Sequence, residues 1–115
     1  MSQYVEQDRV ARPKAWVLLE LAVMERRRVR LRYHGTDRVV CPHVLGWKNG
    51  RAKALLFQVA VTGQGAVADS PREHWRSMFV DEIEDAVVVE GNWETAENFS
   101  LSSNCVEVVG VAVRE

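Results

Sequence analysis

A change of hydrophobic period at residue 28 constrains the fold of this chain more than any other feature. Residues 13–27 carry apolar side chains at the 3.6-residue spacing of a helix and open on a proline, which suits a first helical turn. Residues 28–33 instead alternate charged and apolar side chains, which is typical of a half-buried strand. We therefore expect one helix over 13–27 followed by β-structure, with residues 1–12 as a flexible N-terminus.

Turn signals divide the rest of the chain into short strands. The pair Asn49-Gly50 is a strong hairpin signal, and Pro42 predicts an edge position or a bulge in the strand before it. We expect strands at 28–33, 39–47, 54–61, 75–80, 86–90 and 105–114, polar connections at 62–74 and 91–104, and an acidic turn at 81–85. One helix and five to six strands predict a mainly β protein, a small antiparallel barrel over 28–115 in a single domain over 13–115.

The charges are unevenly distributed along the chain. Net charge is −1, but residues 1–57 hold 12 Lys and Arg against 5 Asp and Glu, whereas residues 58–115 hold 3 against 11. A basic patch for an anionic partner is one interpretation. Salt bridges between the two halves, each contributing little, are the other. Charge alone favours the salt bridges, because a dedicated nucleic-acid binder is usually net basic.

Several functional classes lack support in the sequence. No apolar run reaches the roughly 20 residues of a membrane span, and the polar N-terminus is unlike a signal peptide, so we expect a cytoplasmic protein with no membrane contact. Cys41 and Cys105 are expected to be buried free thiols, with a bond between neighbouring strands as the alternative. Cys41, His43 and His74 show no zinc spacing, and no serine has a nucleophile context. We expect no metal, no cofactor and no enzymatic activity.

Several motifs follow one another in a specific order. An Arg-rich junction at 26–32 leads to Tyr33-His34-Gly35, and the strand Arg38-Val-Val-Cys-Pro-His-Val-Leu-Gly46 leads to the hairpin at 49–51. The later motifs are Gln58, Trp75-Arg76 and Asp81-x-Ile83. This order resembles the WYL domain, in particular its short stand-alone WYL-like form, over roughly residues 23–90. Two positions depart from the family: Ala52-Lys53-Ala54 replaces the Trp-Tyr-Leu triplet, and Phe79 stands where the family often has an arginine.

The resemblance implies an SH3-like, Sm-like barrel that senses a ligand. Such domains are mostly attached to bacterial transcription regulators or phage-defence proteins, and their ligands are thought to be nucleotides or single-stranded nucleic acid. The basic positions that match or adjoin those of the family are Arg38, Arg51, Lys53 and Arg76. Arg51 and Lys53 share a strand face, and Arg76 would complete a three-cation cluster if it pairs across from them. The alternative is that these cations pair with Glu73, Asp81 or Glu84.

The remaining candidates each have a structural alternative. His43 is either a neutral histidine held by a backbone hydrogen bond or a ligand contact. Trp75 is a candidate lip of a pocket beside Arg76. A secondary basic face of Arg28, Arg30 and Arg32 would follow a nucleic-acid backbone, with Tyr33, Trp47 or Trp75 as stacking platforms, or else would be solvated.

Two functions follow from these residues. The first is a stand-alone regulatory module that binds an anionic ligand and reports binding to a partner protein. The second is a non-catalytic interaction module, or a homodimer, formed through the open edge of the strand at 105–114 or through the helix that carries Trp16.

Overall fold

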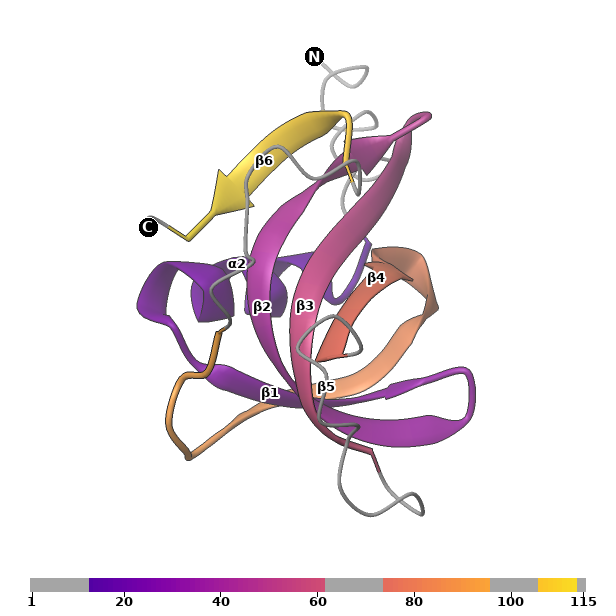
Figure 1. The fold of residues 1–115 in the computed structure, drawn as a ribbon. Coiled ribbons are helices and arrows are strands. Elements are labelled where there is room, and N and C mark those ends of the chain that lie inside the picture. The colour runs from indigo at the N-terminus through magenta and orange to yellow at the C-terminus, as the bar shows by residue number, and fades with distance from the viewer. Residues whose placement is uncertain (1–12, 62–73, 96–105, 114–115) are drawn as a thin grey trace.

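The fold is a bent six-stranded antiparallel sheet with one helix packed against it (Figure 1). The computed structural model describes residues 13–61, 74–95 and 106–113. The elements in chain order are α2 (Trp16–Glu25), β1 (Arg28–Tyr33), β2 (Thr36–Lys48), β3 (Arg51–Val61), β4 (Trp75–Phe79), the 3-10 turn η1 (Val80–Glu82), β5 (Ile83–Val89) and β6 (Val108–Ala112). The prediction of a mainly β protein with one N-terminal helix is confirmed.

The strand order is β4-β3-β2-β1-β5, and β6 pairs with β2 beside this path. All pairings are antiparallel; Val29 lies opposite Val40, and Tyr33 lies opposite Ile83. The turn η1 joins β4 to β5, which are the two ends of the strand order, so the sheet has to curl to bring them together. This curl is consistent with a small barrel.

The helix is shorter than its hydrophobic period predicts. It begins at Trp16 and ends at Glu25, because Arg26 adopts the left-handed conformation with φ 55 and its N–H bonds to the carbonyl of Ala22. A left-handed residue with such a bond is a common helix C-terminus. Arg26 and Arg27, which the helix expected over 13–27 included, therefore follow the helix instead.

Strands β2 and β3 are longer than the sequence predicts, and β6 is shorter. Strand β2 passes through Pro42 without a break, and the predicted bulge is the register shift between Pro42 and Val44. Strand β3 begins at Arg51, directly after the hairpin, and β5 begins at Ile83, so the acidic turn contracts to η1. Strand β6 covers only part of the predicted final strand.

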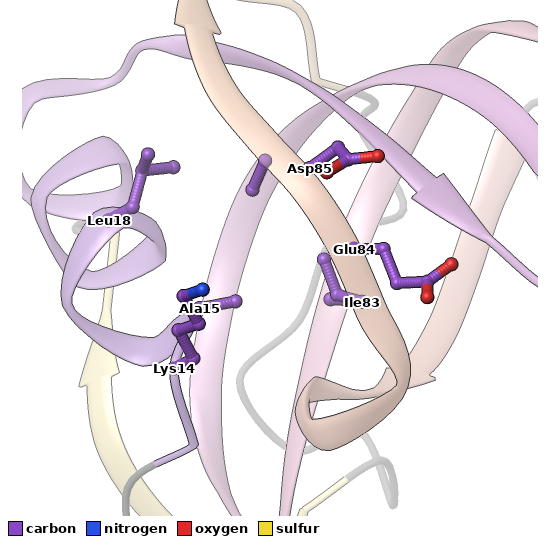
Figure 2. A pocket seen from close by; sticks show the side chains of 7 residues that line it. Lys14, Ala15, Leu18, Ile83, Glu84 and Asp85 are labelled. Atoms are coloured by element: carbon purple, nitrogen blue, oxygen red, sulfur yellow. The ribbon is translucent and has the colours of Figure 1, made fainter.

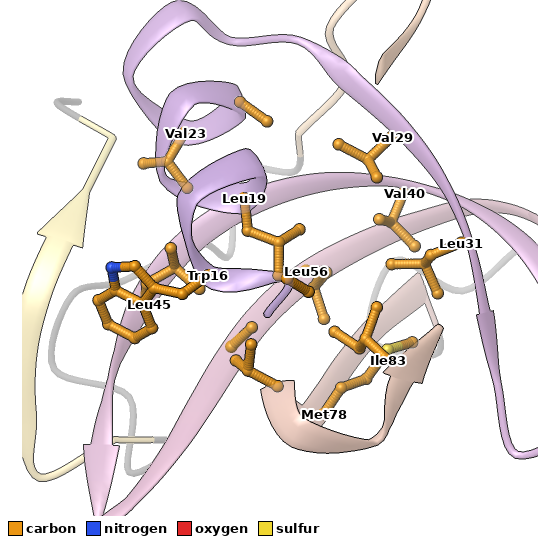
Figure 3. Close-up of a cluster of buried hydrophobic side chains, with 14 of the residues drawn as sticks. Trp16, Leu19, Val23, Val29, Leu31, Val40, Leu45, Leu56, Met78 and Ile83 are labelled. Carbon is orange, nitrogen blue, oxygen red and sulfur yellow. The ribbon is translucent and has the colours of Figure 1, made fainter. Parts of the chain in front are cut away.

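The hydrophobic core lies between the helix and the inner face of the curled sheet (Figure 3). The helix contributes Trp16, Leu19, Ala22 and Val23, and these side chains are at most 2% exposed. Strands β1 and β2 contribute Val29, Leu31, Val40 and Leu45, and β3, β4 and β5 contribute Leu56, Met78 and Ile83. Burial of one such aliphatic side chain contributes about 1.5–3 kcal/mol. The helix is therefore part of the core.

Gly46 permits the close approach of β6 to β2. A Cβ at this position would lie well inside van der Waals contact with the carbonyl oxygen of Val108. We expect Gly46→Ala to displace β6 and to lower the free energy of unfolding by about 1–3 kcal/mol, the usual cost of overpacking. Amide hydrogen exchange of β6 is the measurement. Gly50→Ala is no suitable control because its φ is 77, but Ala52→Gly leaves the β6 contact intact and serves instead.

Parts of the predicted organisation lie outside the described residues. These are the flexible N-terminus at 1–12 and most of the connections expected at 62–74 and 91–104. Among the described residues no helix combines the length and apolar character needed to cross a membrane.

Candidate functional site

The predicted basic residues fall on opposite faces of the sheet. Lys53 pairs with Phe79, whereas Arg76 pairs with the core residue Leu56. Directly paired residues project to the same side of an antiparallel sheet. Arg76 therefore lies on the inner side, and Arg51 and Lys53 lie on the outer side. Arg76 therefore does not complete the three-cation cluster, because it pairs three positions further along β3 than that cluster requires.

Arg51 is held by acidic side chains on the outer face. Its Nε and Nη2 donate to the two carboxylate oxygens of Asp81 at 3.0 and 2.8 Å, and Nη2 also donates to Glu82 at 2.6 Å. The guanidinium lies 3.7 Å from the centre of the Phe79 ring, and Lys53 lies 5.2 Å from the same ring. The hydrogen bonds to Asp81 and then Glu82 raise the pKa of Arg51. The alternative prediction, pairing with Asp81, is confirmed.

Glu82 links this ion pair to the turn after β1. Its other carboxylate oxygen lies 2.5 Å from Nε2 of His34, whose ring stacks on Tyr33. The hydrogen bonds from His34 and then from Arg51 lower the pKa of Glu82. The acidic second half of the chain thus neutralises part of the basic first half.

The secondary basic face is interrupted by carboxylates. Arg28 donates to the carbonyl of Asn92 at 2.6 Å and pairs with Glu94, and Arg32 pairs with Asp37 at 3.0 Å. The bond to Asp37 is the main cause of a raised pKa of Arg32. Arg30 is exposed and forms no ion pair with any described residue. A continuous track of unpaired cations on β1 is therefore not present in the described strands.

Arg38 and Arg76 differ from Arg28, Arg32 and Arg51 because they donate to neutral acceptors. Arg38 is half-buried, and its terminal nitrogens donate to the side chain of Gln58 at 3.1 Å and to the carbonyl of Tyr33 at 3.3 Å. Arg76 donates to the carbonyl of Trp75 at 3.1 Å. All of these acceptors are neutral, and within residues 13–61, 74–95 and 106–113 neither arginine forms an ion pair.

The environment of Arg38 disfavours its own charge. Burial, and then the nearby charge of Arg76, lower the pKa of Arg38. Its Nε is buried without a hydrogen-bond partner in the described part of the chain. A buried polar atom without a partner is uncommon and calls for an explanation, such as a ligand. Two guanidiniums without carboxylates have the geometry and charge to hold an anion.

His43 is fully buried in the bulge of β2. The carbonyl of Cys41 lies 2.7 Å from Nδ1, which therefore donates, so that Nε2 accepts from the hydroxyl of Thr95 at 2.8 Å. Burial is the main cause that lowers the pKa of His43 to about 4, so the ring is neutral at pH 7. A neutral histidine held by the backbone was one of the two interpretations from the sequence, and these contacts agree with it.

Aromatic rings surround His43 on the outer face of the sheet. Trp75 meets the ring edge-on at 4.8 Å, and Trp93 lies 4.6 Å away at a tilt of 34°. Phe57 lies 5.2 Å from Trp75 and stacks on His74 at 5.0 Å. Because neighbouring residues of a strand point to opposite faces, Trp75 and Arg76 project to opposite sides of the sheet. The role of Trp75 as the lip of a pocket stays a prediction.

The sequence did not predict the contribution of residues 92–95 to this cluster. Besides the contacts to Arg28 and His43, the N–H of Glu94 donates to the sulfur of Cys41 at 3.3 Å. Cys41 is a buried free thiol, as expected, and burial raises its pKa. Cys105 lies outside the described residues. The only sequence signal for this segment was Trp93, an aromatic residue in an otherwise polar connection.

A groove of about 520 Å³ lies between the start of α2 and β5 (Figure 2). Its lining comprises Lys14, Ala15, Leu18, Ile83, Glu84, Asp85 and Ala86, none of which was predicted to bind a ligand. Figure 2 shows the carboxylates of Glu84 and Asp85 pointing away from the helix, and both polar and apolar atoms line the groove. Within the described ranges, no three His, Cys, Asp or Glu side chains are grouped as a metal site.

We compared the chain with known proteins. No family model, no curated protein and no solved structure matches the chain.

Proposed function

We propose that the chain is a non-catalytic ligand-sensing module that binds a phosphate-bearing ligand through Arg38 and Arg76. The ligand class is a nucleotide or a short single-stranded nucleic acid, and binding is reported to a partner protein, as the resemblance to the WYL-like form implies. One observation carries the proposal. In the described part of the chain, Arg38 and Arg76 lie close enough to repel each other and both lack a carboxylate partner, whereas Arg28, Arg32 and Arg51 each have one.

A bound phosphate would relieve an unfavourable feature of this place. Its negative charge would offset the repulsion between Arg38 and Arg76. Guanidinium groups match phosphate oxygens with paired hydrogen bonds. A hydrogen bond to a charged group contributes about 1.5–3 kcal/mol, which is enough to select a phosphate over a neutral ligand.

The proposed site contains fewer residues than the ligand-binding set predicted from the sequence. Arg51 is held by two carboxylates, and Lys53 shares its outer face. His43 is buried, and Trp75 packs against it. We therefore place these four residues outside the phosphate contact.

Calorimetric titration of the full chain tests the proposal. The ligands are a mononucleotide and a short oligonucleotide with and without a 5′-phosphate. We expect Arg76→Glu to weaken binding at least about tenfold, because one charge-assisted contact is replaced by a repulsion. Arg38→Lys keeps the charge but loses the guanidinium fork, and it is expected to weaken binding as well.

Arg30→Glu is the matched control for this experiment. Arg30 is also exposed and makes no ion pair with described residues, but it lies on the outer face of β1. The substitution changes the net charge by the same amount as Arg76→Glu. Equal losses in the two variants would contradict a site at Arg38 and Arg76, and so would a wild-type chain that binds none of the ligands.

A further inference from the structure

The groove between the start of α2 and β5 is separate from the proposed phosphate site (Figure 2). Neither Arg38 nor Arg76 is among its described lining residues. Its volume of about 520 Å³ lies within the range of about 300–1,000 Å³ that is typical of small-molecule sites. Aliphatic side chains line it on the helix side and on the strand side, namely Ala15, Leu18, Ile83 and Ala86. The groove therefore has the size and the walls to hold a small molecule with an apolar body.

A bulge in β5 shapes the strand side of the groove. The register of β5 against β1 shifts between Arg30 and Arg32, and Asp85 adopts the left-handed conformation with φ 52. A bulge adds one residue to one strand and so changes which of its side chains face inward. Ile83 and Ala86 are three positions apart, and strict alternation would place them on opposite faces. Because of the bulge, both pack toward the hydrophobic core.

Small side chains leave the groove unfilled. Ala15 lines it on the helix side and Ala86 on the strand side, and each side chain ends at Cβ. Protein interiors are close-packed, with few voids larger than a water molecule. A hollow of this volume between two short side chains at the edge of the core is therefore a place where the apolar part of a ligand can replace water.

The charges around the groove favour a negative group on that ligand. Glu84 and Asp85 also line the groove, but Figure 2 shows their carboxylates pointing away from the helix. Glu84 lies directly opposite Arg32 in the sheet, and after the hydrogen bond from Asp37 the charges of both carboxylates raise the pKa of Arg32. Both acidic groups therefore act on the outer face of the sheet.

Lys14 is the cation of this groove. It is exposed, it contributes the only side-chain nitrogen of the described lining, and it forms no ion pair with a described residue. The first turn of α2 contains no acidic residue that would compete for it. A single ammonium is one point charge, which matches a carboxylate, whereas phosphate is commonly held by guanidinium forks.

We propose that the groove binds an amphiphilic carboxylate, a small molecule with one carboxylate group and an alkyl body. The alkyl body lies between the helix side and the strand side, in contact with Leu18 and Ile83. The carboxylate accepts hydrogen bonds from the ammonium of Lys14. The aliphatic walls offer no aromatic ring for stacking, which favours an alkyl chain over a flat ring system. This site does not depend on a phosphate at Arg38 and Arg76.

NMR titration of the full chain with three ten-carbon probes tests the proposal. The probes are decanoate, decanol and decyltrimethylammonium, which share the alkyl chain and differ in the charge of the head group. We expect decanoate to bind most tightly and to shift the amide signals of residues 14–18 and 83–86. Shortening the carboxylate to octanoate and hexanoate is expected to weaken binding by up to about fourfold for each buried methylene removed.

Two variants with matched controls test the two parts of the site. Ala86→Leu fills the groove and is expected to weaken decanoate at least tenfold, whereas the same change at the exposed Ala60 of β3 leaves binding unchanged. Lys14→Gln is expected to weaken decanoate about two- to fivefold and to leave decanol unchanged. Lys48→Gln removes the same charge at the end of β2 and is expected to have no effect.

Several outcomes would overturn the proposal. A wild type that binds none of the probes would do so, and so would tighter binding of decyltrimethylammonium than of decanoate. Circular dichroism verifies the fold of each variant; if Ala86→Leu did not fold, equal effects of Lys14→Gln on decanoate and decanol would still contradict the site. Loss of decanoate binding in Arg76→Glu would place the carboxylate at the phosphate site instead. That variant is expected to weaken nucleotides alone, so the two proposals fail separately.

Discussion

Replacing Trp16 with alanine is expected to lower the free energy of unfolding by about 3–5 kcal/mol, the range for a buried tryptophan. Trp16 is 2% exposed and stacks on Trp47 with ring centres 4.8 Å apart. Its ring also lies against Gly110 of β6. It therefore connects the helix with β2 and β6, and its loss would leave a cavity where the three elements meet.

Urea denaturation followed by circular dichroism measures this effect. Val17→Ala is the control, because Val17 follows Trp16 in the same helix but is 70% exposed. At micromolar concentration we expect Val17→Ala to change stability by less than about 0.5 kcal/mol. If the two variants unfolded within 1 kcal/mol of each other, Trp16 would not be the structural centre that its contacts indicate.

Mild acid is expected to destabilise the chain through His43. In the unfolded chain the pKa of a histidine is near 6.5, whereas in the folded chain burial lowers the pKa of His43 to about 4. Between these values the unfolded state binds a proton that the folded state does not, so stability falls as the pH falls. At 1.36 kcal/mol per pH unit the loss is about 2 kcal/mol by pH 5 and about 3 kcal/mol by pH 4.

Measurements between pH 7 and pH 5 distinguish the effect of His43 on stability from the effect of the carboxylates. The lowered pKa of Glu82 contributes stability that is lost only as the pH falls through the acidic range below that window. His43→Gln has no ionisable group at this position, so its stability is expected to change less between pH 7 and pH 5. Denaturant midpoints at pH 7, 6 and 5 for both proteins measure the difference. Equal slopes would mean that His43 titrates normally in the folded chain.

The element types were predictable because each depends on local periodicity. The alternation in 28–33 places Val29, Leu31 and Tyr33 in the core and their neighbours outside, as the burial of β1 shows. The bounds were harder to predict. The sequence does not reveal that Arg26 turns left-handed, or that β2 continues through Pro42 because a bulge absorbs the irregularity. Both depend on how the ends of an element meet the rest of the fold.

The candidate site was harder to predict than the fold, because it depends on register. Arg76 and Lys53 are both basic residues in adjacent strands, and only the pairing of Arg76 with Leu56 shows that they face opposite sides. The partners of Arg51 come from residues 30 and 31 positions away, and the contacts to His43 come from Thr95, 52 positions away. A local sequence pattern cannot predict contacts between residues that lie so far apart along the chain. The charge asymmetry of the two halves was the one global signal for the ion pairs.

The burial of Cys41 affects how fast a thiol reagent can react with it. Its sulfur lies under the backbone of Glu94, and burial keeps it in the protonated form. A thiol-specific reagent needs an exposed thiolate, so its reaction with Cys41 reports how often the segment at 92–95 lifts from the sheet. In a Cys105→Ser background, the ratio of this rate to that of a free thiol is an opening constant. The modification rate of Cys41 therefore measures local opening of the segment at 92–95, and it can be compared with and without a bound ligand.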